Sequence, residues 1–137
     1  MSLDLEQAKL IADKIFRFAK DDGLAPVCIV VADFSGNPLV VYTMDGCPPA
    51  SITVAMAKAY TVSRTRTDTI EYGLRNHFDV ANWADSRMTA FGGGVVVKSP
   101  FSGFYTGSVG VSGRSQEEDH ILAGLRHDGW SIMPNSY

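Results

Sequence analysis

Lys58 is the residue whose surroundings in the sequence most clearly indicate chemistry. It is one cation in a run of small and apolar side chains, with Ala57 before it and Ala59 after it. Loss of water lowers the pKa of a lysine, and a lysine fixed in a pocket provides a positive contact for an anion. The alternative is a lysine at a helix edge whose ammonium group reaches solvent. Composition alone leaves both interpretations open.

Asp45 and Ser51 are polar side chains that precede Lys58 in the chain. Asp45 stands before Gly46 at the expected end of a strand, where aspartate commonly bonds its own backbone in a turn. The functional alternative is a carboxylate that orients Lys58 or binds a polar ligand. We expect Ser51 to cap the helix that carries Lys58. The N–H groups at such a helix start also bind anions, so a cap and a binding site are compatible here.

Two glycine-rich segments, residues 91–94 (FGGG) and residues 107–113 (GSVGVSG), can bring a ligand close to backbone N–H groups. Glycine reaches positive φ angles and allows close approach to the main chain. The alternative is that these glycines serve turns and close packing of the backbone. Because Ser112 has no base placed beside it in the sequence, it does not qualify as a nucleophile.

Histidines and cysteines give no support to a metal site. His120 and His127 lie seven residues apart on one expected helix, which is about two turns and too far for one metal ion. His77 falls in a segment without clear periodicity. Cys28 belongs to an apolar strand and Cys47 to a proline-rich loop, and no C-x-x-C pair is present. Motifs of serine hydrolases, zinc proteases and phosphate loops are also missing from the sequence.

Composition predicts one soluble domain over residues 1–137. Apolar residues make up 45% of the chain and charged residues 20%, with a net charge of −3. A slightly acidic chain with scattered basic residues argues against nucleic acid as a partner. No apolar run approaches the ~20 residues that span a bilayer, and the start of the sequence does not resemble a signal peptide. We therefore expect no membrane partner and a cytoplasmic location.

Hydrophobic periodicity predicts helices that alternate with pairs of strands. The helices are expected at residues 4–22, from 51 onward, at 70–75 and from 115 to about 127, and the strands at 27–33, 39–44, 95–98 and 105–112. Residues 76–90 show no clear period. Strands joined by hairpins, with helices between the pairs, indicate an α+β fold with an antiparallel sheet.

The order of the short motifs resembles the GlcG/HbpS family, which also includes the C-terminal domain of PduO-type proteins. The motifs are MDG at 44–46, Ser51, AKA at 57–59, FGGG at 91–94, GSVGVSG at 107–113 and EED at 117–119. The resemblance extends over residues 3–125. It implies a profilin-like fold, in which helices cover an antiparallel sheet of about five strands.

The resemblance also implies a small-molecule ligand. Known members of the family bind haem, and PduO-type domains are associated with corrinoid metabolism. A ligand pocket at a subunit interface is implied, in a homo-oligomer of two to eight copies. Haem is the candidate cofactor, although the first expected helix contains no histidine. The ligand-binding candidates are Met44, Asp45, Ser51, Lys58, Phe91, Gly92, Gly93, Gly94, Ser112 and Gly113.

Two other functions are compatible with the sequence. The first is an enzyme acting on a small carboxylate or keto acid, as an isomerase or hydrolase, with Lys58 and Asp45 as catalytic candidates for general acid–base chemistry. That chemistry requires both groups to lie within hydrogen-bond reach of one substrate. The second is a purely structural partner protein.

Overall fold

The structure is a computed structural model, and it describes residues 1–76 and 85–126. The elements follow one another as α1 (Leu5–Asp21), β1 (Cys28–Ala32), β2 (Pro38–Thr43), α2 (Pro49–Thr65), α3 (Thr69–Asn76), β3 (Gly94–Lys98), β4 (Tyr105–Ser112), α4 (Gln116–Ala123) and a 3₁₀ turn, η2 (Gly124–Arg126). Both predicted hairpins form, β1–β2 and β3–β4, as does each predicted helix.

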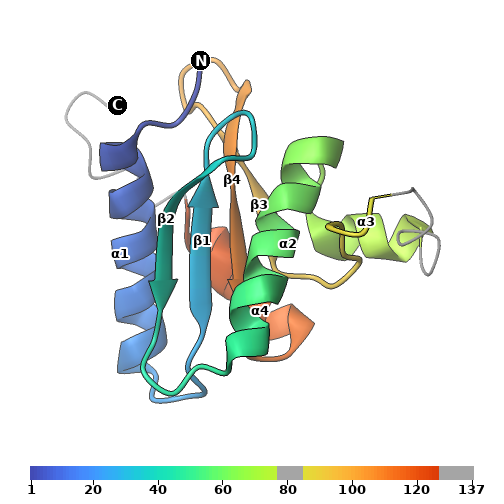
Figure 1. The fold of residues 1–137 in the computed structure, drawn as a ribbon. Coiled ribbons are helices and arrows are strands. Elements are labelled where there is room, and N and C mark those ends of the chain that lie inside the picture. Colours follow the sequence, from blue (N-terminus) through green and yellow to red (C-terminus); the bar gives the residue numbers. More distant parts are fainter. Residues whose placement is uncertain (77–84, 127–137) are drawn as a thin grey trace.

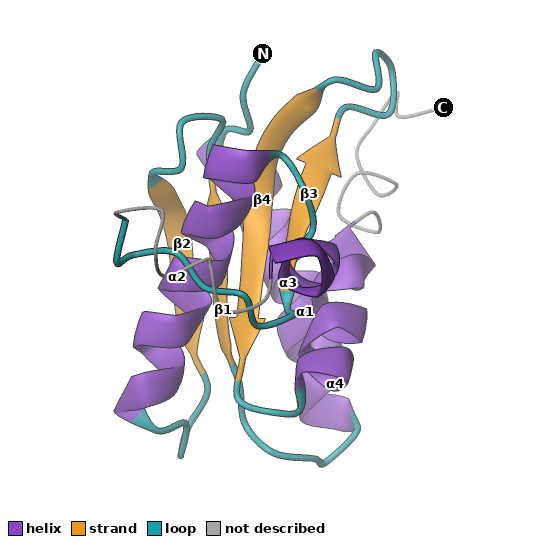
Figure 2. Cartoon of the chain, turned by 90° about the vertical axis from the view of Figure 1, so that its right-hand side faces the viewer, coloured by secondary structure: helices purple, strands orange, loops and turns teal. Residues whose placement is uncertain are grey.

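The described strands form one antiparallel sheet in the order β2-β1-β4-β3. The predicted α+β class with an antiparallel sheet is confirmed. The sheet has four strands in the described ranges, where about five were expected. Helices cover both faces: α1 lies against one face and α2 against the other (Figure 1). Figure 2 shows α2 and α3 in front of the sheet, on the face opposite α1.

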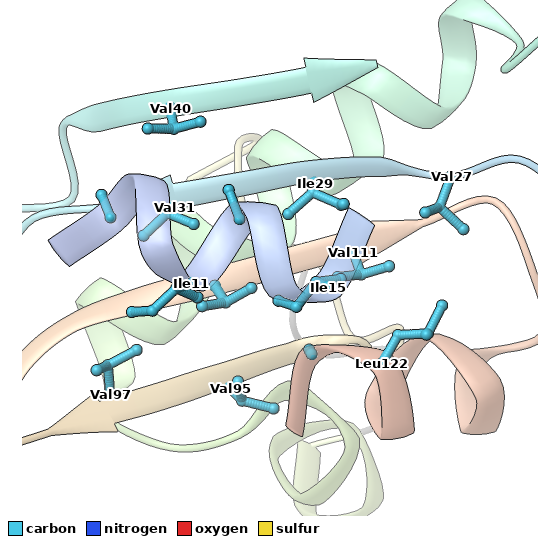
Figure 3. Close-up of a cluster of buried hydrophobic side chains, with 14 of the residues drawn as sticks. Ile11, Ile15, Val27, Ile29, Val31, Val40, Val95, Val97, Val111 and Leu122 are labelled. Carbon is cyan, nitrogen blue, oxygen red and sulfur yellow. The ribbon is translucent and has the colours of Figure 1, made fainter. Parts of the chain in front are cut away.

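The larger core lies between the sheet, α1 and α4. Ile11 and Ile15 of α1 point toward valines of the sheet, and Leu122 of α4 completes the cluster (Figure 3). The start of α1 is fixed as predicted, because the Asp4 carboxylate accepts the N–H of Gln7 and the Gln7 side chain accepts the N–H of Asp4. This capping box satisfies two backbone donors at the helix start.

The opposite face of the sheet is built for close approach of α2. Gly94 of β3 and Gly110 of β4 are register partners under this helix. A Cβ atom on Gly110 would lie 2.2 Å from the carbonyl oxygen of Ala55, and one on Gly94 would lie 2.7 Å from that of Lys58. The backbone of α2 therefore rests almost directly on two strands. Part of the glycine pattern that suggested a ligand loop serves this contact.

The predicted helix cap at Ser51 is wrong. Helix α2 begins at Pro49, its N-cap is Pro48, and no side chain caps it. Proline suits the first helical position because its φ is preset and its missing N–H would have had no partner inside the helix. Ser51 lies in the first turn instead. Ser115 does cap α4 as predicted, by accepting the N–H of Glu118.

Candidate functional site

Lys58 is buried and paired with an aspartate. Its ammonium group donates to Oδ2 of Asp119 at 3.0 Å and to the carbonyl oxygen of Val111 at 2.8 Å. The side chains of Lys58 and Asp119 are 3% and 2% exposed. Because Lys58 comes from α2, Val111 from β4 and Asp119 from α4, this one cation joins three elements of the fold.

Asp119 also fixes the turn between β4 and α4. Its Oδ1 accepts the backbone N–H of Arg114 at 3.0 Å. The side chain of Arg114 in turn forms an ion pair with Asp22 and donates to the carbonyl oxygens of Ala19 and Ala25. The buried carboxylate is thereby linked, through one residue, to the end of α1.

Gly93 lies against the Lys58–Asp119 pair. Its φ is +127°, a region that favours glycine, and a Cβ atom there would lie 2.7 Å from Nζ of Lys58 and 2.9 Å from Cβ of Asp119. The carbonyl oxygen of Gly93 accepts the N–H of Val111 at 2.9 Å. The glycine turn thus covers the ion pair with bare backbone, because no side chain fits.

The N–H groups beside Gly93 are used by the protein itself. Gly92 donates to the side-chain oxygen of Gln116 at 3.0 Å, and Gly94 donates to the hydroxyl of Thr69 at 2.8 Å. Two of the donors that the sequence offered to a ligand are therefore bonded to side chains of α3 and α4. The segment acts here as a packed turn.

Loss of hydration on burial is the main cause of the pKa shifts of Lys58 and Asp119. Burial lowers the pKa of Lys58 and raises the pKa of Asp119, and in each case the charge and hydrogen bond of the partner oppose the shift. A buried ion pair stabilises a fold little on balance, but removing one partner leaves an uncompensated charge inside the protein. The two residues are therefore energetically dependent on each other.

Asp45, Met44 and Phe91, which were also predicted as site residues, have surroundings different from those of Lys58. Asp45 is solvent-exposed, and the ion pair of Lys58 within the described residues is with Asp119. Met44 packs against the core, and its sulfur accepts the N–H of Val27. Phe91 is mostly exposed. The expected pairing of Lys58 with Asp45 is not what the structure contains.

Ser112 and Gly113 end β4 at the side of the ion pair. Ser112 is buried, and a Cβ atom on Gly113 would lie 2.4 Å from the carbonyl oxygen of Pro26. Sequence reasoning missed Asp119, although the signal was present. Asp119 shares a helix face with Leu122 and Ala123, so a carboxylate occupies an inward position on α4.

A groove of about 680 Å³ lies between α2 and β1. It is bounded by α2, by β1, by the turn between β1 and β2, and by residues 86–87. Its lining is mainly apolar and includes Val30, Ile52, Met56 and Ala59. Neither Lys58 nor the glycine turn lines it. Sequence analysis did not predict this groove.

Tyr60, Asp85 and Arg87 form a hydrogen-bonded cluster at the groove. The Tyr60 hydroxyl donates to Oδ2 of Asp85 and accepts a hydrogen bond from Nη2 of Arg87. Arg87 also bonds Oδ1 of Asp85 at 3.2 Å, and its guanidinium carbon lies 4.3 Å from the centre of the Tyr60 ring. The hydrogen bond to Asp85 is the main cause that raises the pKa of Tyr60.

The described residues contain no group of three or more histidine, cysteine or acidic side chains arranged to hold a metal ion. None of their helices is long and apolar enough to cross a membrane. His77 and His127 lie outside the described residues, whereas His120 lies on α4.

We predict that Gly93→Ala destabilises the fold by about 1–3 kcal/mol or more, because alanine is strained at this φ and its methyl group would collide with Lys58 and with the carbonyl oxygen of Val111. Gly46→Ala is the matched control, since Gly46 also has a positive φ but its nearest neighbour would lie 3.8 Å away. Urea unfolding measures both. Equal losses would show that Gly93 is constrained only by its backbone angle.

Comparison with known proteins gives one consistent result. A family model described as "Haem degrading protein HbpS-like" matches residues 3–125. A 15.0 kDa protein from the dhaT-dhaS intergenic region of Citrobacter freundii is 31% identical, over 96% of this chain and 94% of its own.

Solved structures agree with that match. The chain superposes on the Klebsiella pneumoniae protein ORFY with a TM-score of 0.87 and 27% identity, covering 96% of this chain and 92% of the other. It superposes on a complex of PduOC with haem at a TM-score of 0.85 and 22% identity, covering 94% and 95%. At this sequence identity, the similarity to PduOC shows a shared fold only.

Proposed function

The chain belongs to the HbpS-like family, and from that premise we propose that it binds haem, or another flat apolar ligand with carboxylate groups, in the groove beside α2. The observation that supports this most is the groove itself. Its volume of about 680 Å³ and its mainly apolar lining are typical of small-molecule sites. The proposed site is the groove between α2 and β1, which Lys58 does not line, whereas the sequence had suggested a pocket around Lys58.

The residues of the groove fit a haem. Met56 and Tyr60 both line it, and methionine sulfur and tyrosine oxygen are among the atoms that hold haem iron in proteins. Arg87 is 69% exposed at the groove and offers its guanidinium group to a carboxylate. A bound haem would supply an iron centre, and the chain itself would bind, orient and shield that ligand.

Acid–base catalysis by Lys58 and Asp45 has less support. The Lys58 side chain is 3% exposed, and its ammonium group is already bonded to Asp119 and Val111. A substrate would have to separate a buried ion pair before it could use this lysine. We propose a structural role for Lys58 and Gly93, and we assign ligand binding to the groove.

We also propose that the chain is a homo-oligomer, as the sequence suggested. Phe34 and Met56 are large apolar side chains that are each more than one-third exposed. Light scattering at micromolar concentration should therefore give a particle of at least two chains of 14.8 kDa. A monomer mass would contradict this proposal without affecting the assignment of the groove.

Binding in the groove predicts a specific effect of Ile52→Glu. A carboxylate at Ile52 would place negative charge in an apolar groove and repel the carboxylates of haem. We expect the affinity for ferric haem, followed by absorbance titration, to fall at least tenfold, about 1.4 kcal/mol. Ile121→Glu is the matched control, because Ile121 is 64% exposed on α4 and does not line the groove.

Two results would contradict the proposal. The first is a wild-type chain that shows no saturable change in the haem spectrum. The second is equal haem affinity for Ile52→Glu and Ile121→Glu, with both variants folded as judged by circular dichroism. Equal affinities would mean that haem binds somewhere other than the α2 groove.

A further inference from the structure

We infer that Tyr60 provides the oxygen ligand for ferric iron when a haem occupies the α2 groove, and that Asp85 and Arg87 position this oxygen. The inference rests on the proposed function, because it concerns the same groove. It goes further by naming the ligand atom and the chemical class of the ligand, a ferric porphyrin.

Tyr60 is placed on α2 where it lines the groove. Tyr60 follows Met56 by one helical turn on α2, and both side chains line the groove. Ala55 and Lys58 of the same helix are buried and do not line the groove. Tyr60 is therefore on the side of α2 that a ligand in the groove would contact.

Hydrogen bonds hold the Tyr60 hydroxyl from two directions. It donates to Asp85 and accepts from Arg87, and Asp85 and Arg87 are bonded to each other. The Arg87 guanidinium also lies over the Tyr60 ring. Asp85 and Arg87 are 25 and 27 residues away in the chain, so a distant segment fixes the position of this one oxygen.

The chemistry of the phenol oxygen suits this role, because haem iron is held by tyrosine oxygen in some haem proteins. If a ferric porphyrin occupied the groove, the Tyr60 hydroxyl would give its proton to Asp85 and then to water, and the Tyr60 oxygen would hold the iron. No electron would be transferred, so the iron would stay ferric. Arg87 keeps its hydrogen bond and offsets the negative charge of the tyrosinate oxygen.

Two variants distinguish Tyr60 from Met56 as the ligand of the iron. Tyr60→Phe keeps the ring and removes only the ligand oxygen, whereas Met56→Leu removes the other iron ligand that the groove offers. Tyr42→Phe is the matched control. The Tyr42 hydroxyl also donates to an aspartate, Asp13, at 2.7 Å, but Tyr42 lines a different cavity.

The experiment is a titration with ferric haem, followed by absorbance and resonance Raman spectroscopy. We expect tyrosinate-to-iron signals in the wild type, in Tyr42→Phe and in Met56→Leu. Tyr60→Phe should lose these signals and bind ferric haem at least tenfold more weakly. Metal-free protoporphyrin is the second probe: Tyr60→Phe should bind it as tightly as the wild type does, because no iron is involved.

The outcomes distinguish this inference from the proposed function. If the wild type binds neither porphyrin, the proposed function and the inference both fail. If the wild type binds ferric haem and Tyr60→Phe gives the same spectrum and affinity, Tyr60 is not the ligand and the proposed function stands. Loss of the iron signals in Met56→Leu alone would assign the iron to the sulfur and overturn the inference.

Discussion

The ion pair between Lys58 and Asp119 is the contact on which the arrangement of this fold depends. It joins α2 to α4 and, through Val111, to the end of β4. A charged pair with almost no solvent contact is tolerated only where both charges are kept together and hydrogen-bonded. This requirement favours glycine at position 93, since a Cβ atom there would lie 2.7 Å from Nζ of Lys58 and 2.9 Å from Cβ of Asp119.

The same contact positions the groove. Helix α2 has two different sides: small residues face the sheet, where Gly94 and Gly110 let the backbones approach, and larger side chains face outward. Fixing Lys58 fixes the rotation of α2 about its axis, and hence the direction in which Met56 and Tyr60 point. Lys58, which the sequence suggested as a ligand contact, thus orients the helix that carries the proposed ligand site. The proposed site and the buried pair lie on opposite sides of one helix.

Local signals in the sequence predicted most of the fold. The capping box at Asp4, the turns of the two hairpins and the cap at Ser115 depend on residues close together in the chain, and all three form. The cap at Ser51 failed because Pro48 and Pro49 start the helix earlier. Lys58 was recognised as unusual, but its partner was sought in Asp45, nearby in sequence, whereas Asp119 is 61 residues away. The cluster of Tyr60 with Asp85 and Arg87 involves a segment without periodicity, so no pattern could place it.

A double-mutant cycle on Lys58 and Asp119 tests this account most directly. The free energy of unfolding would be measured in urea for Lys58→Met, Asp119→Leu and the double variant. Each single variant leaves one buried charge alone and should lose about 3–5 kcal/mol. The double variant leaves none, so its loss should be smaller than the sum of the single losses by well over 1 kcal/mol. Additive losses, or single variants as stable as the wild type, would show that the fold does not depend on this pair.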